Sequence, residues 1–135
     1  MVRQLTVDSS VIISSLLKNE TRHKEAYAIW ENIIKGKSYA IMPLSVMVEV
    51  VAAIKRRTGS EELALAIKKE LISTDNISFV ILDDTAALEA ADIAAKTGLR
   101  GMDAIVVQVA KEFETELISF DEEMIRKAKA VLKKR

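Results

Sequence analysis

Cysteine is absent from the 135 residues of this chain, and histidine occurs once. Disulfides and thiolate metal sites are therefore excluded, and a bound metal would have to be held by oxygen ligands or by the single histidine. Proline also occurs once and glycine four times. The sequence contains no proline-rich or glycine-rich linker, no internal repeat and no low-complexity segment.

Long apolar runs and an excess of one charge are missing as well. The longest apolar runs, such as residues 40–44, fall far short of the roughly 20 residues that span a membrane. Asp8 interrupts the apolar N-terminal segment, which does not resemble a secretory signal, so we expect a cytoplasmic protein. Twenty Lys and Arg balance twenty Asp and Glu. If several acids gather in one site, however, the remaining surface carries an excess of positive charge.

The pattern of apolar residues predicts alternating strands and helices. Short apolar segments predict strands at residues 5–7, 39–42, 77–82 and 116–119. Helical spacing predicts helices at residues 11–17, 23–35, 43–57, 61–72, 84–97, 102–113 and 122–132. We expect Ser9 and Ser10 to cap the first helix, Pro43 to lie in the first turn of the third, and Asp83 or Asp84 to cap the fifth.

Strands separated by helices predict right-handed crossovers and a parallel sheet that is covered on both faces. The predicted fold class is therefore α/β, a three-layer α/β/α sandwich with a short parallel sheet, formed by one domain over residues 1–135. The order of the strands does not follow from these patterns.

Three acids lie where strands end or helices begin. Asp8 and Asp121 each follow a predicted strand directly, and Asp103 lies in the first turn of a predicted helix. Each of the three has a structural alternative, because Asp is a common helix cap and is favoured near helix N-termini. Ligands of open α/β sheets usually bind beyond the carboxyl ends of the strands, where these acids are expected to meet.

Glu49 is the acid that a structural role explains least well, because nearly all of its neighbours from residue 44 to 53 are apolar. Burying an unpaired carboxylate costs several kcal/mol. Its helix face also carries Ser45, Ala52, Ala53 and Arg56. The side chain could pair with Arg56, or it could reach a ligand across a groove of small residues.

Four converging carboxylates would repel one another strongly without a counter-charge. Oxygen-only ligation by carboxylates is what Mg²⁺ and Mn²⁺ prefer, and such sites commonly bind the ion together with substrate phosphates. Asp8, Glu49, Asp103 and Asp121 therefore predict a Mg²⁺ or Mn²⁺ site for phosphodiester chemistry. No nucleophilic side chain is required, because a metal ion can activate the attacking water.

Several segments resemble PIN domains. Residues 5–11, LTVDSSV, resemble the opening of these domains, residues 98–104, GLRGMDA, resemble the segment with their third acid, and residues 117–121, LISFD, resemble their closing strand. The strand at residues 39–42, followed by Pro43 and Glu49, matches the placement of their second acid. The resemblance spans essentially the whole chain and is greatest for the VapC-type toxins of toxin–antitoxin pairs.

This resemblance implies an endoribonuclease that depends on Mg²⁺ or Mn²⁺, acts on RNA, is often dimeric and is inhibited by a small cognate antitoxin. Asp8, Glu49, Asp103 and Asp121 match the acidic quartet of the family. Ser9 and Ser119 match hydroxyl positions beside the first and last acids. Phe120 is a departure, because many relatives have a polar residue there.

Arg100 is a further candidate for the site, whereas His23 is not. Arg100, three residues before Asp103, could contact a phosphate or pair with an acid. His23 has no acidic partner that spacing predicts, and we expect it at the surface.

Two other functions fit the same residues less well. One is a catalytically silent PIN-like module that binds RNA or a protein, and the other is a phosphotransfer domain that is phosphorylated on Asp8. The presence of all four acids argues against the first. Ser10 stands where the second would usually have another acid, which argues against phosphotransfer.

Overall fold

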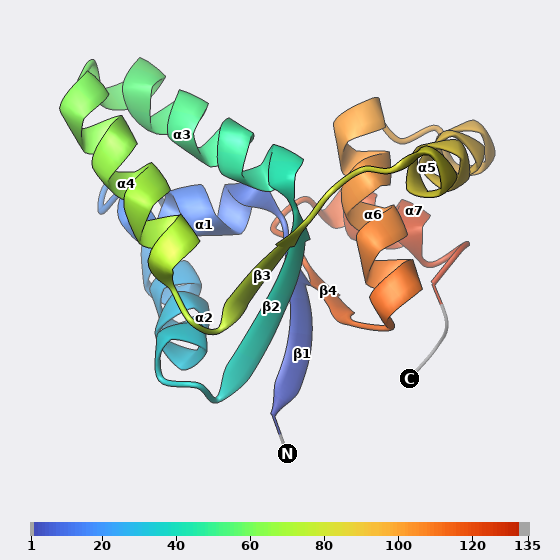
Figure 1. Cartoon of the computed structure of the whole chain (residues 1–135), viewed down its shortest axis with the longest axis horizontal. Helices are drawn as coiled ribbons and strands as arrows, with labels where there is room; N and C mark the ends of the chain where they lie inside the picture. Colours follow the sequence, from blue (N-terminus) through green and yellow to red (C-terminus); the bar gives the residue numbers. More distant parts are fainter. Residues whose placement is uncertain (1, 133–135) are drawn as a thin grey trace.

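A computed structural model describes residues 2–132 of the chain. Its four strands form one sheet in which neighbouring strands are parallel, in the order β3-β2-β1-β4. The strands are β1 (Arg3–Val7), β2 (Ser38–Pro43), β3 (Ile77–Val80) and β4 (Glu116–Ile118). From β1 the chain adds β2 and then β3 on one side, whereas β4 lies on the other side of β1 (Figure 1).

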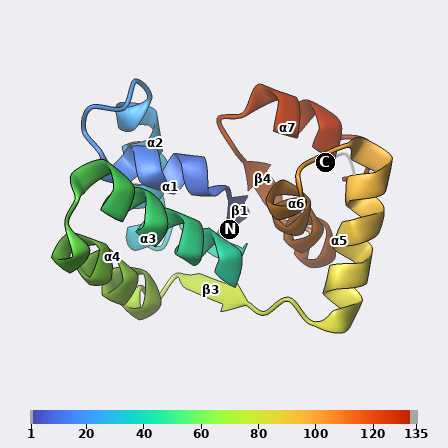
Figure 2. The ribbon, with the colours of Figure 1, turned by 90° about the horizontal axis from the view of Figure 1, so that it is seen from above.

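The helices cover both faces of this sheet. They are α1 (Ser9–Leu16), α2 (His23–Ile34), α3 (Leu44–Thr58), α4 (Glu61–Ser73), α5 (Asp84–Thr97), α6 (Gly101–Phe113) and α7 (Glu122–Ala128). Seen from above, α1 to α4 form one layer and α5 to α7 the other, with the strands between them (Figure 2). The predicted three-layer α/β/α sandwich with a parallel sheet is therefore confirmed.

The core lies on both faces of the two central strands. Leu5 and Val7 of β1 and Met42 of β2 are at most 2% exposed. Helix α6 packs directly against β1 and β2 from one side, and α2 and α3 contact β2 from the other. The buried residues that these helices contribute include Ile33, Val46, Val50, Ile54, Val106 and Val107. This packing fixes the carboxyl ends of the strands relative to the helices that follow them.

The strand order places a topological switch point between β1 and β4, where the chain connections leave the sheet in opposite directions. Crevices at such points, beyond the carboxyl ends of the strands, are the usual ligand sites of open α/β sheets. Asp8 follows β1, and its backbone N–H donates to the Ile118 carbonyl at the end of β4 (2.9 Å). The first predicted site residue therefore lies at the switch point.

Four local expectations differ from the structure. Asp8, not Ser9 or Ser10, caps α1, because its carboxylate accepts the first free N–H of that helix. Pro43 is extended (ψ 150°) and pairs with Val80 at the end of β2, so α3 begins one residue later. Helix α7 ends at Ala128, after which two N–H groups bond three residues back in a tighter turn. The third strand ends at Val80 instead of Leu82.

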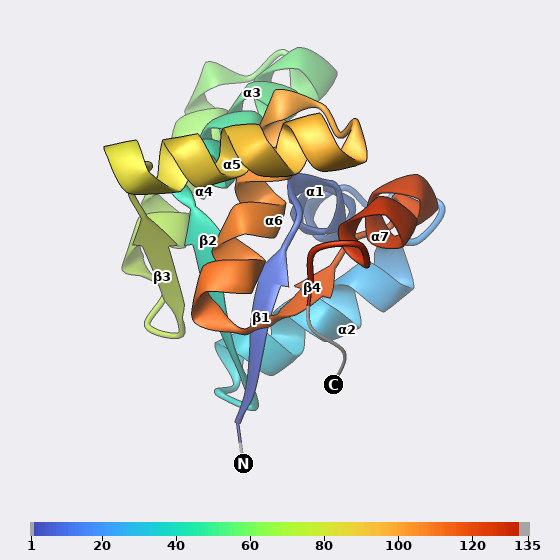
Figure 3. The same ribbon diagram turned by 90° about the vertical axis from the view of Figure 1, so that its right-hand side faces the viewer.

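Helix boundaries elsewhere follow the predicted signals. The Ser60 hydroxyl accepts the N–H of Leu63 at the start of α4, and Asp83 accepts the N–H of Ala86 at the start of α5. Helix α5 crosses over α6 at one end of the molecule and packs against it (Figure 3). Within residues 2–132, no helix has the length and apolar character that crossing a membrane requires.

Candidate active site

The Asp8 carboxylate is held in one orientation at the end of β1. Its Oδ1 accepts the backbone N–H of Ser9 (2.9 Å), and its Oδ2 accepts the hydroxyls of Ser10 (2.9 Å) and Ser119 (3.1 Å). The residue is 6% exposed. Three donors around a nearly buried carboxylate fix its direction.

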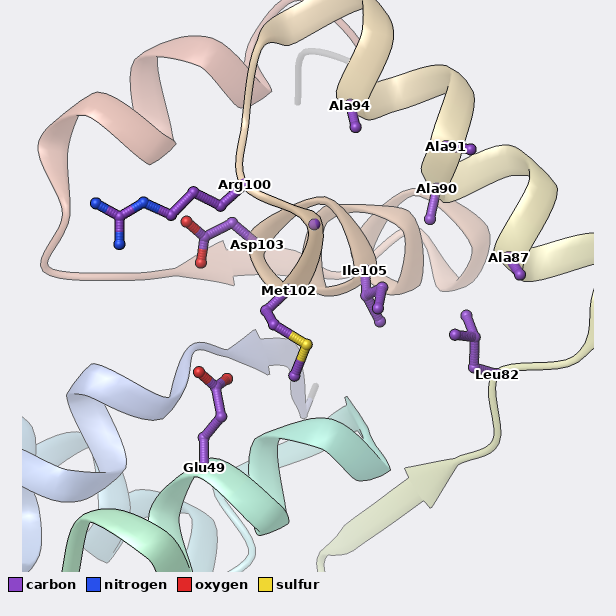
Figure 4. A pocket seen from close by; sticks show the side chains of 11 residues that line it. Glu49, Leu82, Ala87, Ala90, Ala91, Ala94, Arg100, Met102, Asp103 and Ile105 are labelled. Carbon is purple, nitrogen blue, oxygen red and sulfur yellow. The ribbon is translucent and has the colours of Figure 1, made fainter. Parts of the chain in front are cut away.

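Glu49 extends from the middle of α3 toward the N-terminus of α6 (Figure 4). Its pKa is raised above the usual carboxyl range, chiefly by burial and then by the negative charges of Asp8 and Asp103. A hydrogen bond with Ser9 partly opposes this rise in pKa. The causes of this shift place Glu49 near two other acids, although it lies 41 positions after Asp8 in the sequence.

Asp103 lies in the first turn of α6, which begins at Gly101. Burial is the largest cause that raises its pKa, followed by the charges of Asp8 and Asp121, while Arg100 lowers it. The carboxylate points from α6 into the space that Glu49 faces from α3 (Figure 4). A helix N-terminus favours an acid, but here burial and the neighbouring acids outweigh that preference.

Asp121 caps α7 from the loop that follows β4. Its Oδ1 accepts the backbone N–H groups of Glu123 (3.0 Å) and Met124 (3.1 Å). Its own N–H donates to the Ser119 hydroxyl (3.0 Å), the same hydroxyl that bonds Asp8. One serine therefore connects the last of the four predicted acids to the first.

The structure thus brings the four predicted acids into one electrostatic cluster. Asp8 affects the pKa of both Glu49 and Asp103, and Asp121 affects that of Asp103. Among residues 2–132, however, no three Asp, Glu or His side chains are placed so that they would enclose a metal ion together. The donor set itself, all carboxylate oxygens in excess of nearby cations, fits a hard divalent ion.

A pocket of about 580 Å³ opens beside Glu49 and Asp103. Arg100 lies at its charged end, close enough to lower the pKa of Asp103 (Figure 4). Four alanines of α5 and three larger apolar side chains line the rest: Ala87, Ala90, Ala91, Ala94, Leu82, Met102 and Ile105. The small residues that we expected beside Glu49 on its own helix do not line this pocket, whose small side chains come from α5, and Ala53 of α3 is buried.

Other expectations about single side chains also differ from the structure. Arg56 forms no ion pair with Glu49 in the described part of the chain, so that structural alternative is wrong. His23 is not a plain surface residue, because its Nδ1 lies 2.8 Å from the Ser14 carbonyl and its ring is half-buried beside Tyr27. Ser10 was missed as a partner of Asp8. Its position two residues after an Asp at a strand end was the available signal.

Arg22 and Phe120 meet beside the site, which the sequence did not predict. The Arg22 guanidinium carbon lies 3.8 Å from the centre of the Phe120 ring. The two residues belong to the loop before α2 and the loop before α7, and nothing in their spacing relates them.

Comparison with known proteins agrees with the fold. The family model of the PIN domain matches residues 5–130. Among solved structures, the chain is similar to the toxin VapC20 of Mycobacterium tuberculosis, which is described as cleaving the sarcin–ricin loop. The two superpose with a TM-score of 0.77 at 17% sequence identity, over 90% of this chain and 93% of the toxin. No curated protein matches the chain. The family model covers nearly the whole sequence, and the chain therefore belongs to the PIN domain family.

Proposed function

We propose that this chain is a divalent-metal-dependent endoribonuclease that acts as a single domain and hydrolyses phosphodiester bonds of RNA in the cytoplasm. The observation that carries the proposal is the cluster of Asp8, Glu49, Asp103 and Asp121 at the switch point of a PIN domain. Two of these acids have raised pKa values, which is a mark of groups held together for a ligand or a reaction.

The four carboxylates would hold Mg²⁺ or Mn²⁺, and such an ion lowers the pKa of a bound water and stabilises negative charge on phosphate oxygens. The chain's own residues prepare the site. Ser10 and Ser119 orient Asp8, and Ser9 lies close enough to Glu49 to lower its pKa. Arg100, exposed at the mouth of the pocket, offers a planar donor group to a substrate phosphate.

The role that we propose in the cell is that of a toxin. The similar VapC20 structure is described as a toxin that cleaves the sarcin–ricin loop, and the similarity extends over 90% of this chain. By this proposal the partner is a small cognate antitoxin that covers the acidic cluster. A purified protein encoded beside this chain should then abolish RNA cleavage at an equimolar ratio, and a neighbour without effect would contradict the pairing.

We further propose a homodimer that forms through an apolar surface beside the pocket. Ile81 is 72% exposed and Leu88 of α5 is 70% exposed, next to the pocket-lining Leu82 at 47% and Met102 at 41%. Exposed large apolar side chains that cluster in this way mark interaction surfaces. By light scattering, the parent should have the mass of two chains and Leu88→Glu that of one. Ile72→Glu on α4, also at an exposed apolar residue, should remain dimeric. A monomeric parent would refute the dimer.

The test of the main proposal is cleavage of a panel of structured RNAs by the purified protein with Mn²⁺, with Mg²⁺ and with EDTA. Asp8→Asn is the essential control against contaminating nucleases, and we expect it to cut at least about 100-fold more slowly. If the chain is instead a catalytically silent binding module, RNA should bind, but the parent and Asp8→Asn should show the same background cleavage with and without EDTA.

A further inference from the structure

Arg22 and Phe120 form a stacked pair at the edge of the acidic cluster. The guanidinium lies over the aromatic ring, with 3.8 Å between its central carbon and the ring centre. Phe120 is half-buried and packs against the core. The ring therefore supports the guanidinium from the protein side.

Glu25 fixes the orientation of the same guanidinium. Arg22 Nε donates to Glu25 Oε2 (2.9 Å), and Nη2 contacts both carboxylate oxygens (2.9 and 2.8 Å). The Arg22 side chain remains 44% exposed. Glu25 thus holds one edge of the guanidinium and Phe120 covers one face, while part of the side chain is exposed to solvent. Because Glu25 neutralises the charge, attraction of phosphate is not the main property of this pair.

The backbone places Phe120 between two residues of the site. Ser119 bonds Asp8 through its hydroxyl, and Asp121 is the last acid of the cluster. Asp121 lies in the loop before α7, whereas Glu49 belongs to α3, and Asp121 is not among the residues that line the pocket with Glu49 and Asp103, so it lies at the end of the cluster away from the pocket. A nucleotide chain that crosses the carboxylates would leave them at this end beside the stacked pair.

We propose that the Arg22–Phe120 pair is a stacking subsite for one unpaired nucleobase next to the phosphate that is cleaved. Unstacked bases bind on aromatic rings and on guanidinium planes, and any base offers a face for this contact. The subsite selects single-stranded nucleotides over duplex, because a paired base cannot leave its stack to reach it. The inference rests on the proposed ribonuclease function and adds the recognition element of the same site.

The test is binding of a 12-nucleotide unstructured RNA and of a strand of equal length without bases, measured by fluorescence anisotropy with Mn²⁺. The proteins carry Asp8→Asn so that neither strand is cut. Arg22→Ala should weaken binding of the base-containing strand about 5- to 150-fold, which is about 1–3 kcal/mol at 1.4 kcal/mol per tenfold change. Binding of the abasic strand should not change.

Two further variants separate stacking from charge and from loop structure. Arg22→Lys keeps the charge but has no planar group, and it should lose as much affinity as Arg22→Ala. Arg57→Ala is the matched control. Arg57 of α3 forms an ion pair (2.6 Å) with Glu20, which lies in the same α1–α2 loop as Arg22, and this pair does not involve an aromatic ring. It should bind both strands like the parent.

Full affinity of Arg22→Lys, or equal loss on both strands in Arg22→Ala, would overturn the stacking subsite. A separate cleavage assay of the protein with an intact Asp8 distinguishes failure of the proposed function from failure of the subsite. If that protein cuts no RNA, the proposed function fails. If it cuts RNA and the Arg22 variants bind like the parent, only the subsite fails.

Discussion

Ser119 is the residue that connects the two ends of the chain at the site. Its hydroxyl donates to Asp8 and accepts from the backbone of Asp121, so one small side chain sets the position of two carboxylates. The sequence predicted a supporting role at this position from resemblance alone. The structure supplies the physical reason, which is the placement of residue 119 just beyond β4, beside β1.

Replacing Ser119 by alanine should therefore lower RNA cleavage about 10- to 100-fold, the usual loss when a group that orients a metal ligand is removed. The expected change includes a higher Mn²⁺ concentration for half-maximal rate, because Asp8 is no longer fixed. The measurement is the cleavage rate as a function of Mn²⁺ concentration. Ser73→Ala, which removes an exposed hydroxyl on α4, should leave both quantities as they are. An unchanged Mn²⁺ requirement in Ser119→Ala would contradict this role.

Asp103 gives a prediction about stability and pH. Its pKa is raised in the folded protein, by burial first and by Asp8 and Asp121 next. The folded state therefore binds a proton more tightly than the unfolded state does. The tighter proton binding stabilises the fold fully below the ordinary carboxyl pKa. This stabilisation is lost as the pH rises through the higher pKa of Asp103 in the folded protein. At neutral pH without metal, the charged Asp103 destabilises the fold.

Asp103→Asn should accordingly raise the melting temperature at pH 7 in EDTA, by roughly 2–5 °C for a chain of this size. The gain should shrink as the pH falls toward about 4, where the native carboxyl is protonated as well. Thermal unfolding of both proteins at several pH values measures this. Glu62→Gln, at the start of α4 and outside the site, should show no gain at pH 7. A lower melting temperature for Asp103→Asn at pH 7 would mean that the acid is stabilised rather than strained.

At the scale of elements, local signals in the sequence predicted most helices well, because caps and apolar spacing are properties of neighbouring residues. Ser60 and Asp83 cap α4 and α5 as expected. The strand order, the origin of the alanine-lined pocket wall and the Arg22–Phe120 contact were not predicted. Each depends on segments that are distant in the sequence, and no spacing rule carries that information. Pro43 shows the local limit, because its fixed φ suits both the end of a strand and the start of a helix.

Gly98, at the junction between α5 and α6, is a local signal that affects both the fold and the site. Gly98 ends α5 with φ +74°, a conformation that costs other residues about 1 kcal/mol or more. It directs the chain into Leu99 and Arg100 before α6 begins. Gly101 is its natural comparison, because its φ is not positive and an added Cβ would contact nothing within 4 Å.

Gly98→Ala should thus destabilise the protein by about 1–2 kcal/mol, whereas Gly101→Ala should be neutral or slightly stabilising because it removes a glycine from a helix. Urea unfolding of the two variants beside the parent measures the difference. Because Gly98 also sets the path of Arg100, its variant should lose RNA affinity as well as stability. Equal stabilities for the two alanine variants would show that the left-handed turn at Gly98 is not required.

At the scale of the whole molecule, the acids come from both helical layers. Glu49 belongs to α3 in one layer, Asp103 and Asp121 belong to α6 and the start of α7 in the other, and Asp8 lies between them at the end of β1. Burial is the largest cause that raises the pKa of Glu49, and the repulsion by Asp103 that adds to it acts across the interface between the layers. A divalent ion held by these groups would replace repulsion by attraction and would link the two layers.

Binding of Mn²⁺ should consequently stabilise the entire fold and not only the site. At an ion concentration about 100 times the Kd, linkage predicts about 2.7 kcal/mol, or roughly 10 °C in melting temperature for a chain of this length. The effect should decrease as the pH falls through the raised pKa values of Glu49 and Asp103, because protons then compete with the ion. Differential scanning fluorimetry with and without Mn²⁺ from pH 5 to 8 gives both results. Asp8→Asn should lose most of the shift. A parent protein that melts at the same temperature with Mn²⁺ as with EDTA would contradict the metal site, whatever RNA it binds.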